Sequence, residues 1–218
     1  RDVTGVQTCV FRSNGVSPKD GRLFLANTGP MGGGWGAKHN EDGMNATVCL
    51  NDGDTHITPC EQVEAKYPIL FLNHALRRDS GGAGRFRGGL GTEQIIEARA
   101  PINVNLRVER VHCPPWGLAE GLPALGNQAA LCIDGEMKED LPNGKLASCR
   151  LKKGDRFIYR AGGGGGFGSP KTRDAARVVE DVRQDYVSRD AAREQYGVVI
   201  TPEGSLDADA TRTLRGPA

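Results

Sequence analysis

The sequence predicts an α+β fold, in which a β-rich body of mixed or antiparallel strands with glycine-rich loops precedes a C-terminal helical hairpin. Three observations support this prediction. The 218 residues include 31 glycines and 12 prolines, far too many for a helical bundle. Short apolar runs alternate with turn residues through the middle of the chain, and the apolar spacing then becomes helical. We therefore expect an N-terminal extension over 1–20, a β-rich body over 21–172 and a helical hairpin with a tail over 173–218.

Strands are predicted where short apolar runs are bounded by glycine, proline, asparagine or aspartate. Several connections between these runs are short, whereas parallel neighbours need crossovers of about a dozen residues or more, so antiparallel pairing is expected. The predicted strands span 22–26, 46–50, 69–73, 94–98, 103–108, 129–133 and 155–159.

Capping residues and a valine stripe predict the helical hairpin. Asp174 can cap a helix over 173–185, and Ser188 can cap a second helix over 189–196. The tail over 207–218 is polar and is expected to be partly extended.

Charge and hydropathy exclude several classes of partner. There are 28 basic and 27 acidic residues, so the net charge of +1 does not indicate nucleic acid or an anionic membrane. No run approaches the ~18 consecutive apolar residues of a membrane span, and the start lacks a hydrophobic signal segment. A cytoplasmic protein is therefore expected. The first residue is not methionine, which leaves open that the chain is a piece of a longer polypeptide.

The cysteines do not follow a metal-binding pattern. They lack a C-x-x-C pair, so a local zinc knuckle is not expected. Their wide spacing favours reduced, buried thiols over disulfides, and none is assigned to catalysis. The six are Cys9, Cys49, Cys60, Cys113, Cys132 and Cys149.

Two glycine clusters, at 29–37 and 162–168, are predicted to form loops. The second suggests a phosphate-binding loop but lacks the Gly-Lys-Ser/Thr ending that supplies a cation and a hydroxyl. We therefore favour a tight structural or subunit-contact loop over nucleotide binding.

Two segments carry carboxylates that could perform chemistry. His39, Glu41 and Asp42 lie within four residues, where they could bind a metal or move protons, or form a solvated turn. Glu61 and Glu64 would share one helix face, where they could divide into acid and base or form salt bridges and caps.

A third segment is a glycine-punctuated loop with four arginines around Asp79 and Ser80. The loop could bind a carboxylate or a phosphoryl group, or hold itself together as an Arg–Asp lattice against another subunit. Spacing alone does not rank these alternatives, and His74 as the only nearby histidine is weak support for a serine nucleophile. The arginines are Arg77, Arg78, Arg85 and Arg87.

Several strings together support a family resemblance. In chain order they are GGWGA (33–37) with DG (42–43), TPCE (58–61) with Glu64 and YP (67–68), DSGGAGRFRGGLG (79–91), PPWGL (114–118), the glycine run 162–168, EDV (180–182), and AR (192–193) with YGVV (196–199). In order and spacing they resemble the C-terminal third of the hydantoinase B/5-oxoprolinase family, which includes the large subunits of acetone and acetophenone carboxylases.

The resemblance implies an enzyme of two kinds of subunit. In that family the actin-like A-type chain holds the nucleotide and phosphorylates a carbonyl oxygen, and the B-type chain completes hydrolysis of a cyclic amide or carboxylation of a ketone. It implies ATP and Mg on a partner chain, and Zn or Mn in an N-terminal half that this chain does not contain. A hetero-oligomer with a hydantoinase-A-type partner, and with room for a second B-type chain, is expected.

The residues proposed for catalysis are Asp42, Glu61, Glu64, Asp79 and Arg85. An alternative is a non-catalytic assembly subunit, in which the glycine loops pack between chains and the valine stripe of the hairpin docks on a partner.

Overall fold

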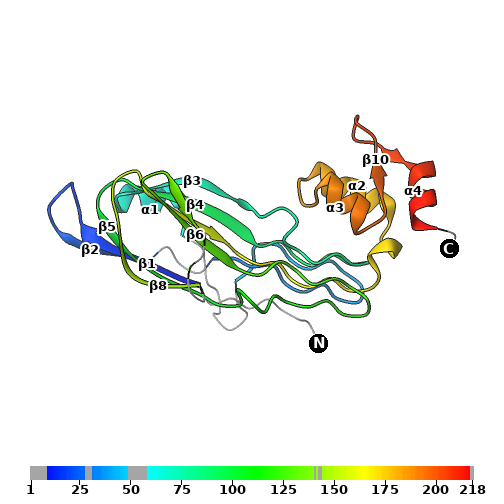
Figure 1. Ribbon diagram of the computed structural model, residues 1–218, viewed down its shortest axis with the longest axis horizontal. Coiled ribbons are helices and arrows are strands. Elements are labelled where there is room, and N and C mark those ends of the chain that lie inside the picture. Colours follow the sequence, from blue (N-terminus) through cyan, green and yellow to red (C-terminus); the bar gives the residue numbers. More distant parts are fainter. Residues whose placement is uncertain (1–8, 28–30, 49–57, 140, 142–143, 217–218) are drawn as a thin grey trace.

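The computed structural model describes residues 9–27, 31–48, 58–139, 141 and 144–216. Two sheets lie at one end of an elongated molecule, and a small helical lobe lies at the other (Figure 1). Glycine-rich loops run from the sheets towards the helical lobe.

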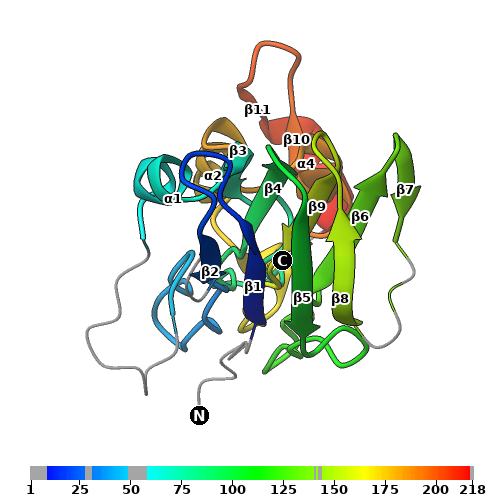
Figure 2. The same cartoon turned by 90° about the vertical axis from the view of Figure 1, so that its left-hand side faces the viewer.

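The body is a sandwich of two sheets whose strands all pair antiparallel (Figure 2). The first sheet has the order β2-β1-β5-β8, with β1 Cys9–Val16, β2 Leu23–Asn27, β5 Ile102–Val108 and β8 Lys145–Leu151. The second has the order β3-β4-β9-β6-β7, with β3 Ile69–Leu76, β4 Thr92–Ala98, β9 Arg156–Arg160, β6 Gln128–Ile133 and β7 Glu136–Lys138. Helix α1, Cys60–Lys66, packs beside β3.

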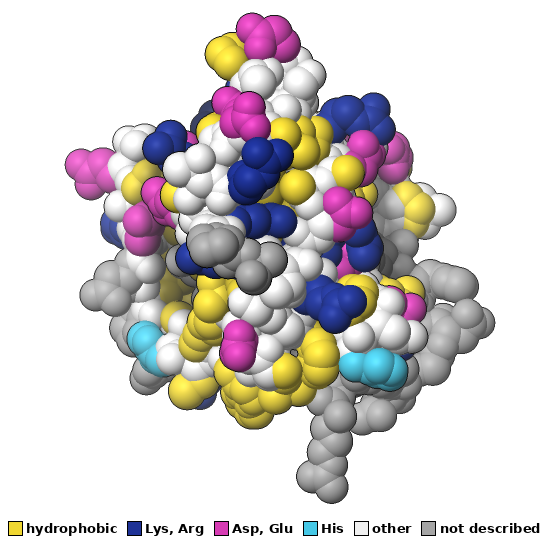
Figure 3. Space-filling view, turned by 90° about the vertical axis from the view of Figure 1, so that its right-hand side faces the viewer, with side chains coloured by type: hydrophobic (Ala, Val, Ile, Leu, Met, Phe, Trp, Pro, Cys, Tyr) yellow, Lys and Arg dark blue, Asp and Glu magenta, His cyan; other side chains and the backbone are white. Residues whose placement is uncertain are grey.

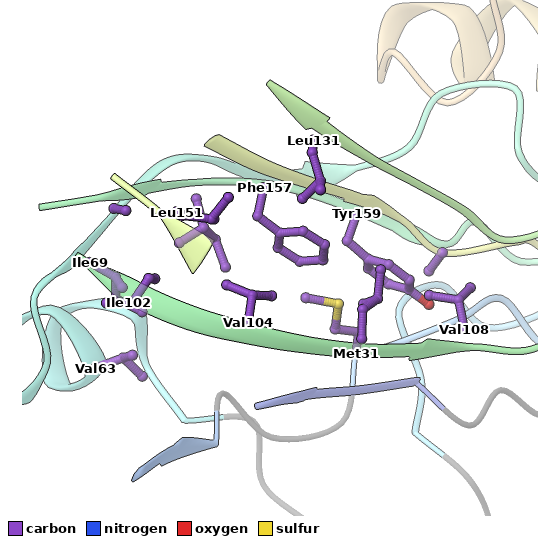
Figure 4. Packing of buried hydrophobic residues seen from close by; sticks show 14 residues of the cluster. Met31, Val63, Ile69, Ile102, Val104, Val108, Leu131, Leu151, Phe157 and Tyr159 are labelled. Carbon is purple, nitrogen blue, oxygen red and sulfur yellow. The ribbon is translucent and has the colours of Figure 1, made fainter. Parts of the chain in front are cut away.

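The core lies between the two sheets because apolar residues alternate along their strands. In β5, the buried Val104 and Val108 point inward between exposed or half-buried polar neighbours. Phe157 and Tyr159 of β9 meet them from the opposite sheet (Figure 4). Burying a side chain such as that of Phe157 stabilises the fold by about 1.5–3 kcal/mol.

The antiparallel β-rich body is confirmed, although single strands differ from the expectation. For the strand predicted at 46–50, residues 49 and 50 lie outside the described residues, and Thr47 forms only an isolated bridge with Gly33. Strands β7 and β8 were not expected, because β8 buries only Leu151 fully and its sequence lacks a strong apolar run. Strand β1 lies within the expected extension and pairs with both β2 and β5.

The glycine loops form a compact layer beside the sandwich, here called the glycine layer and made of segments 32–37, 81–91, 116–122 and 162–168. The run 162–166 lies at its centre, since its backbone groups bond to the other three segments: Gly34 N donates to Gly162 O, Gly164 N to Gly89 O, and Gly166 N to Leu122 O. A Cβ on Gly164 would overlap the carbonyl of Trp35, so this close approach requires glycine.

The helical lobe contains the expected hairpin. Helix α2 spans Ala175–Arg183 and α3 spans Arg189–Glu194. Asp174 caps α2 by accepting from Ala176 N, and Ser188 caps α3 by accepting from Ala191 N. The lobe has its own apolar cluster around Val178 and Tyr196.

The expectation of a partly extended tail over 207–218 is wrong for most of its described residues. After β10 (Val199–Ile200) and β11 (Leu206–Asp207), helix α4 spans Ala208–Arg215. Asp207 caps this helix by accepting from Ala210 N. Arg215 then holds the helix by donating to the carbonyl oxygens of Tyr196 and Arg173, so tertiary contacts stabilise a polar segment as a helix.

Among the described cysteines, Cys60, Cys113, Cys132 and Cys149 are free thiols, as expected. The expected burial is wrong for Cys113, which is exposed, and the other three are half-buried. No helix in the described ranges is both long enough and apolar enough to cross a membrane.

Candidate functional site

Asp42 lies at the junction between the glycine layer and the helical lobe, where it binds two arginines. Its carboxylate accepts from both terminal nitrogens of Arg173, at 2.7 and 2.8 Å, and from Arg177 at 2.7 Å. It also accepts from the backbone N of Arg87 at 2.7 Å. Burial raises the pKa of Asp42, but the hydrogen bonds and charges of Arg173 and Arg87 more than offset this, so the pKa lies below 3.8. Asp42 is therefore ionised and connects the glycine layer to the helical lobe.

A second carboxylate, Asp181 of α2, completes a buried ion network. Arg173, whose side chain is only 1% exposed, donates to Asp181 Oδ2 from Nη2 at 2.8 Å and from Nε at 3.1 Å. Arg87 donates to Asp181 Oδ1 at 3.4 Å, and its guanidinium lies 5.2 Å from the centre of the Tyr186 ring. Burial alone would lower the pKa of Arg173, yet the paired carboxylates raise it, so the network stays charged.

Asp79 connects the arginine loop to the helical lobe. It has a left-handed backbone with φ of 59°, its Oδ1 accepts from Ser188 N at 2.8 Å, and its own N donates to Tyr186 O. The neighbouring Ser80 is fully buried, and its hydroxyl donates to Arg77 O and accepts from Gly91 N. The serine hydroxyl therefore makes its hydrogen bonds within the loop, and His74 is not among its partners.

Arg77 and Arg85 lie in the same loop but differ in exposure. Arg77 is buried and donates to the carbonyl oxygens of Gly126 and Ala161 and to Gln128. Burial, followed by the charge of Arg160, lowers the pKa of Arg77 to about 10, so it remains protonated at neutral pH. Arg85 is exposed, with its guanidinium 5.7 Å from the centre of the Phe86 ring.

Glu61 and Glu64 lie on α1, at the far end of the molecule from the helical lobe (Figure 1). Glu61 is exposed. Glu64 is half-buried and accepts from Phe71 N at 2.7 Å, which fixes the turn between α1 and β3. Glu64 also lines a cavity of about 330 Å³ together with Lys19, Tyr67 and Arg99.

The structure thus gathers Asp42, Asp79 and Arg85 around the glycine layer and places Glu61 and Glu64 elsewhere. Arg173 joins two of these positions directly, because it binds Asp42 and also donates to Arg85 O. Among the described residues, no three His, Cys, Asp or Glu side chains form a group able to hold a metal ion.

One segment of the glycine layer belongs to an exposed apolar loop. The segment 114–125 exposes Trp116, Leu122 and Leu125, and its backbone is fixed by hydrogen bonds from Leu122 N to Ala83 O and from Leu125 N to Ser80 O. Figure 3 shows apolar side chains gathered on this end of the molecule, below the helical lobe. Such a surface on a rigid loop is suited to contact with another protein surface.

Sequence comparison identifies the family of the chain. The family model described as hydantoinase B/oxoprolinase matches residues 4–170. The chain belongs to this family. It is 39% identical over 164 residues to the beta subunit of caprolactamase from Pseudomonas jessenii, a match that covers 71% of the chain and 27% of the relative. It is 29% identical over 188 residues to the B-type chain of a putative D-/L-hydantoinase from a Pseudomonas species, covering 85% of the chain and 31% of that relative.

Solved structures agree with this membership of the hydantoinase B/oxoprolinase family. ATP-dependent caprolactamase from Pseudomonas jessenii superposes with a TM-score of 0.81 at 29% identity, over 94% of the chain and 36% of the matched chain. A nucleotide-free acetone carboxylase gives a TM-score of 0.83 at 22% identity, over 95% of the chain and 32% of the matched chain, and supports the fold. The chain therefore spans about a third of the length of these family members.

Three charged residues of the junction, Arg173, Arg177 and Asp181, were not among the sequence candidates. Asp181 falls within the EDV string that supports the family resemblance, but that string gives no partner. Arg173 was expected as the first residue of a helix, whereas it lies before Asp174, the cap of α2, with its side chain buried. Its partner Asp42 is 131 residues away, so no local spacing could indicate the pair.

Proposed function

We propose that the chain is the C-terminal portion, or a separately encoded counterpart, of a B-type subunit in a cytoplasmic, ATP-dependent multisubunit enzyme that opens a cyclic amide through a phosphorylated intermediate. The observation that carries this proposal is the match to caprolactamase in both sequence and fold. Identity to the acetone carboxylase alpha subunit of Xanthobacter autotrophicus is lower, at 24% over 220 residues, so a cyclic amide is favoured over a ketone.

In this proposal the chain supplies a rigid surface to the enzyme, and its aspartates do not act as general acids or bases. Asp42 and Asp79 already hold structural partners, and the centre of the glycine layer is closed by backbone hydrogen bonds. Arg85 is different, because its exposed guanidinium lies at the edge of that rigid layer. We assign to Arg85 the binding of an anionic group, either a carboxylate or a phosphoryl group, which a planar guanidinium can bind with two hydrogen bonds.

ATP and Mg would bind to a hydantoinase-A-type partner chain. A divalent metal, Zn or Mn, would belong to the N-terminal part of the B-type chain, outside the part of the relatives that this chain matches. The exposed loop with Trp116 and Leu122 supports a hetero-oligomer, because it gives the glycine layer an exposed apolar area. A purely assembling role is the alternative, and it predicts loss of the complex rather than of turnover when the layer is changed.

The test is to isolate the native complex that contains the chain and to measure its intact mass and ATP hydrolysis. We expect a large nucleotide-binding partner, and ATP hydrolysis that depends on a lactam, hydantoin or 5-oxoproline. ATP hydrolysis dependent on a ketone plus bicarbonate would instead reject the cyclic-amide proposal.

Arg85→Gln tests the role of the arginine within that complex. We expect a raised KM or a lowered kcat with the complex intact, since the guanidinium is exposed and not needed for packing. The matched control is Arg22→Gln, an exposed arginine in the turn before β2. Equal turnover for both variants would remove Arg85 from the site, and dissociation of the Arg85 variant complex would favour the assembling role.

A further inference from the structure

Cys60 and His74 form a thiol–imidazole pair far from the helical lobe. Cys60 is the first residue of α1, and His74 lies near the end of β3, the edge strand of its sheet. The sulfur of Cys60 lies 3.0 Å from His74 Nδ1. Neither side chain is fully buried, so a small reagent can reach the sulfur.

Gln94 of β4 orients the imidazole. It is directly opposite His74 in the β3–β4 register, and its side-chain amide lies 3.1 Å from His74 Nε2. Gln94 is only 4% exposed, and its Oε1 is buried without a hydrogen-bond partner among the described residues. The amide nitrogen of Gln94 now faces His74 Nε2, and the amide oxygen and nitrogen can exchange places by a half-turn of the side-chain end. In the exchanged orientation Oε1 accepts from the Nε2–H of His74, and the Nδ1 lone pair faces the thiol.

The groups around the pair favour a neutral resting state. Burial, together with the charges of Glu61 and Glu64 on the same helix, raises the pKa of Cys60, and burial lowers the pKa of His74. The ring of Phe71 stacks beside the imidazole, with ring centres 6.1 Å apart. At neutral pH the pair is therefore a thiol hydrogen-bonded to a neutral imidazole, and the imidazole can accept the thiol proton as the sulfur reacts.

We propose that Cys60 is a reactive thiol that exchanges with low-molecular-weight disulfides, with His74 as its general base and Gln94 as a positioning residue. As the Cys60 sulfur attacks one sulfur of the disulfide, its proton passes to His74 Nδ1. The new S–S bond joins Cys60 to one half of the reagent, and the original S–S bond breaks. The departing thiolate then takes the proton from the imidazolium, so one thiol and one disulfide are consumed and one of each is formed. The site is separate from the glycine layer and does not depend on the proposed function.

The experiment treats the full 218-residue chain with oxidised glutathione and follows the glutathione adduct at each cysteine by mass spectrometry. Fragment sequencing is needed because one tryptic peptide carries both Cys49 and Cys60, and another carries both Cys113 and Cys132. Cys113 is the internal control, since it is exposed and its thiol makes no hydrogen bond to an imidazole of the described residues. At pH about 6.5 we expect Cys60 to react at least about tenfold faster than Cys113, despite its lower exposure.

The pH profile separates base assistance from simple exposure. The Cys113 rate should keep rising with pH, because a thiol without an assisting base reacts only as its thiolate. The Cys60 rate should instead level off once His74 is unprotonated, and burial lowers the pKa of this imidazole from its ordinary value. In His74→Asn, the Cys60 rate should fall at least about tenfold while the Cys113 rate is unchanged. Parallel profiles for the two cysteines in the wild-type chain, or an unchanged Cys60 rate in a folded His74→Asn chain, would overturn the proposal. If that variant does not fold, the wild-type profiles decide.

Discussion

Replacing Asp42 with asparagine should lower the free energy of unfolding, because it weakens the junction between the glycine layer and the helical lobe. The loss should exceed that from the same substitution in an exposed arginine–aspartate pair. The substitution keeps the shape and one acceptor oxygen but removes the charge that faces Arg173 and Arg177. It also places an NH₂ group where an arginine N–H now donates. Removing one partner of a buried ion pair costs about 3–5 kcal/mol. Because the Asp42 side chain is 19% exposed and Asp181 still pairs with Arg173, we expect about 3 kcal/mol.

The matched control is Asp185→Asn, which removes the same charge from an arginine–aspartate pair with the same distance. Arg78 Nη1 lies 2.7 Å from Asp185 Oδ1, but both side chains are more than half exposed. Asp185 has φ of 57°, which asparagine tolerates, so only the ion pair is tested. We expect a cost of about 0.5 kcal/mol or less, as for most exposed pairs.

Urea unfolding, followed by circular dichroism, measures the free energy of unfolding of the wild type and both variants, and thermal unfolding gives their Tm. A loss of about 3 kcal/mol corresponds to a fall in Tm of about 6–12 °C for a chain of this size. Since the folded-state pKa of Asp42 lies below its ordinary 3.8, its stabilisation is complete above that value and is lost as pH falls through the lower folded-state pKa. The gap between wild type and Asp42→Asn should therefore hold at neutral pH and shrink below about pH 4. Equal costs for the Asp42 and Asp185 variants would refute the reasoning.

Five further substitutions, controls included, test the glycine layer, the contact of Asp79 with the helical lobe, and the sandwich core. Gly164→Ala should prevent native packing, seen as loss of near-UV circular dichroism, whereas Gly135→Ala, in open space at φ of 86°, should cost only about 1–2 kcal/mol of backbone strain; equal effects would refute the close-packing argument. Asp79→Asn should change the unfolding free energy by about 0.5 kcal/mol or less because it keeps an acceptor and tolerates a left-handed backbone, whereas Asp79→Ala should lose about 2 kcal/mol; the argument fails if asparagine costs as much. Phe157→Ala should cost about 3–5 kcal/mol in urea unfolding, and a cost below about 1 kcal/mol would contradict the burial of this ring.

The sequence was a good guide to elements whose residues act locally. Short apolar runs bounded by turn residues predicted strands at 94–98 and 103–108, and β4 and β5 form there because each buries one face against the opposite sheet. Asp174 and Ser188 predicted the helix starts because each caps a backbone N–H two or three residues later. Strand β8 was missed because only Leu151 is fully buried in it, and pairing with β5 rather than its own pattern makes it a strand.

The site residues depended on long-range contacts that spacing does not encode. The arginine loop left open whether its charges bind an anion or an internal lattice, and the structure places Arg87 with Asp181, 94 residues further along the chain. Asp79 and Asp42 likewise bind partners more than 100 residues away. For Cys60 and His74 the sequence showed two reactive side chains 14 residues apart, and only the packing of α1 against β3 brings them together.

The central position of the run 162–166 has a consequence for how the chain folds during synthesis. Its hydrogen-bond partners around Gly34, Gly89 and Leu122 all leave the ribosome earlier, and they carry backbone donors and acceptors that this run later satisfies. β9, the middle strand of the second sheet, is made just before the run, so that sheet and the layer gain their central segments within one short stretch of synthesis. Until the run is made, more than 120 residues of the nascent chain include segments that lack their final hydrogen-bond partners, so we expect chaperones to bind the chain up to that point. We expect folding to be late and cooperative, because these contacts join segments far apart in the sequence.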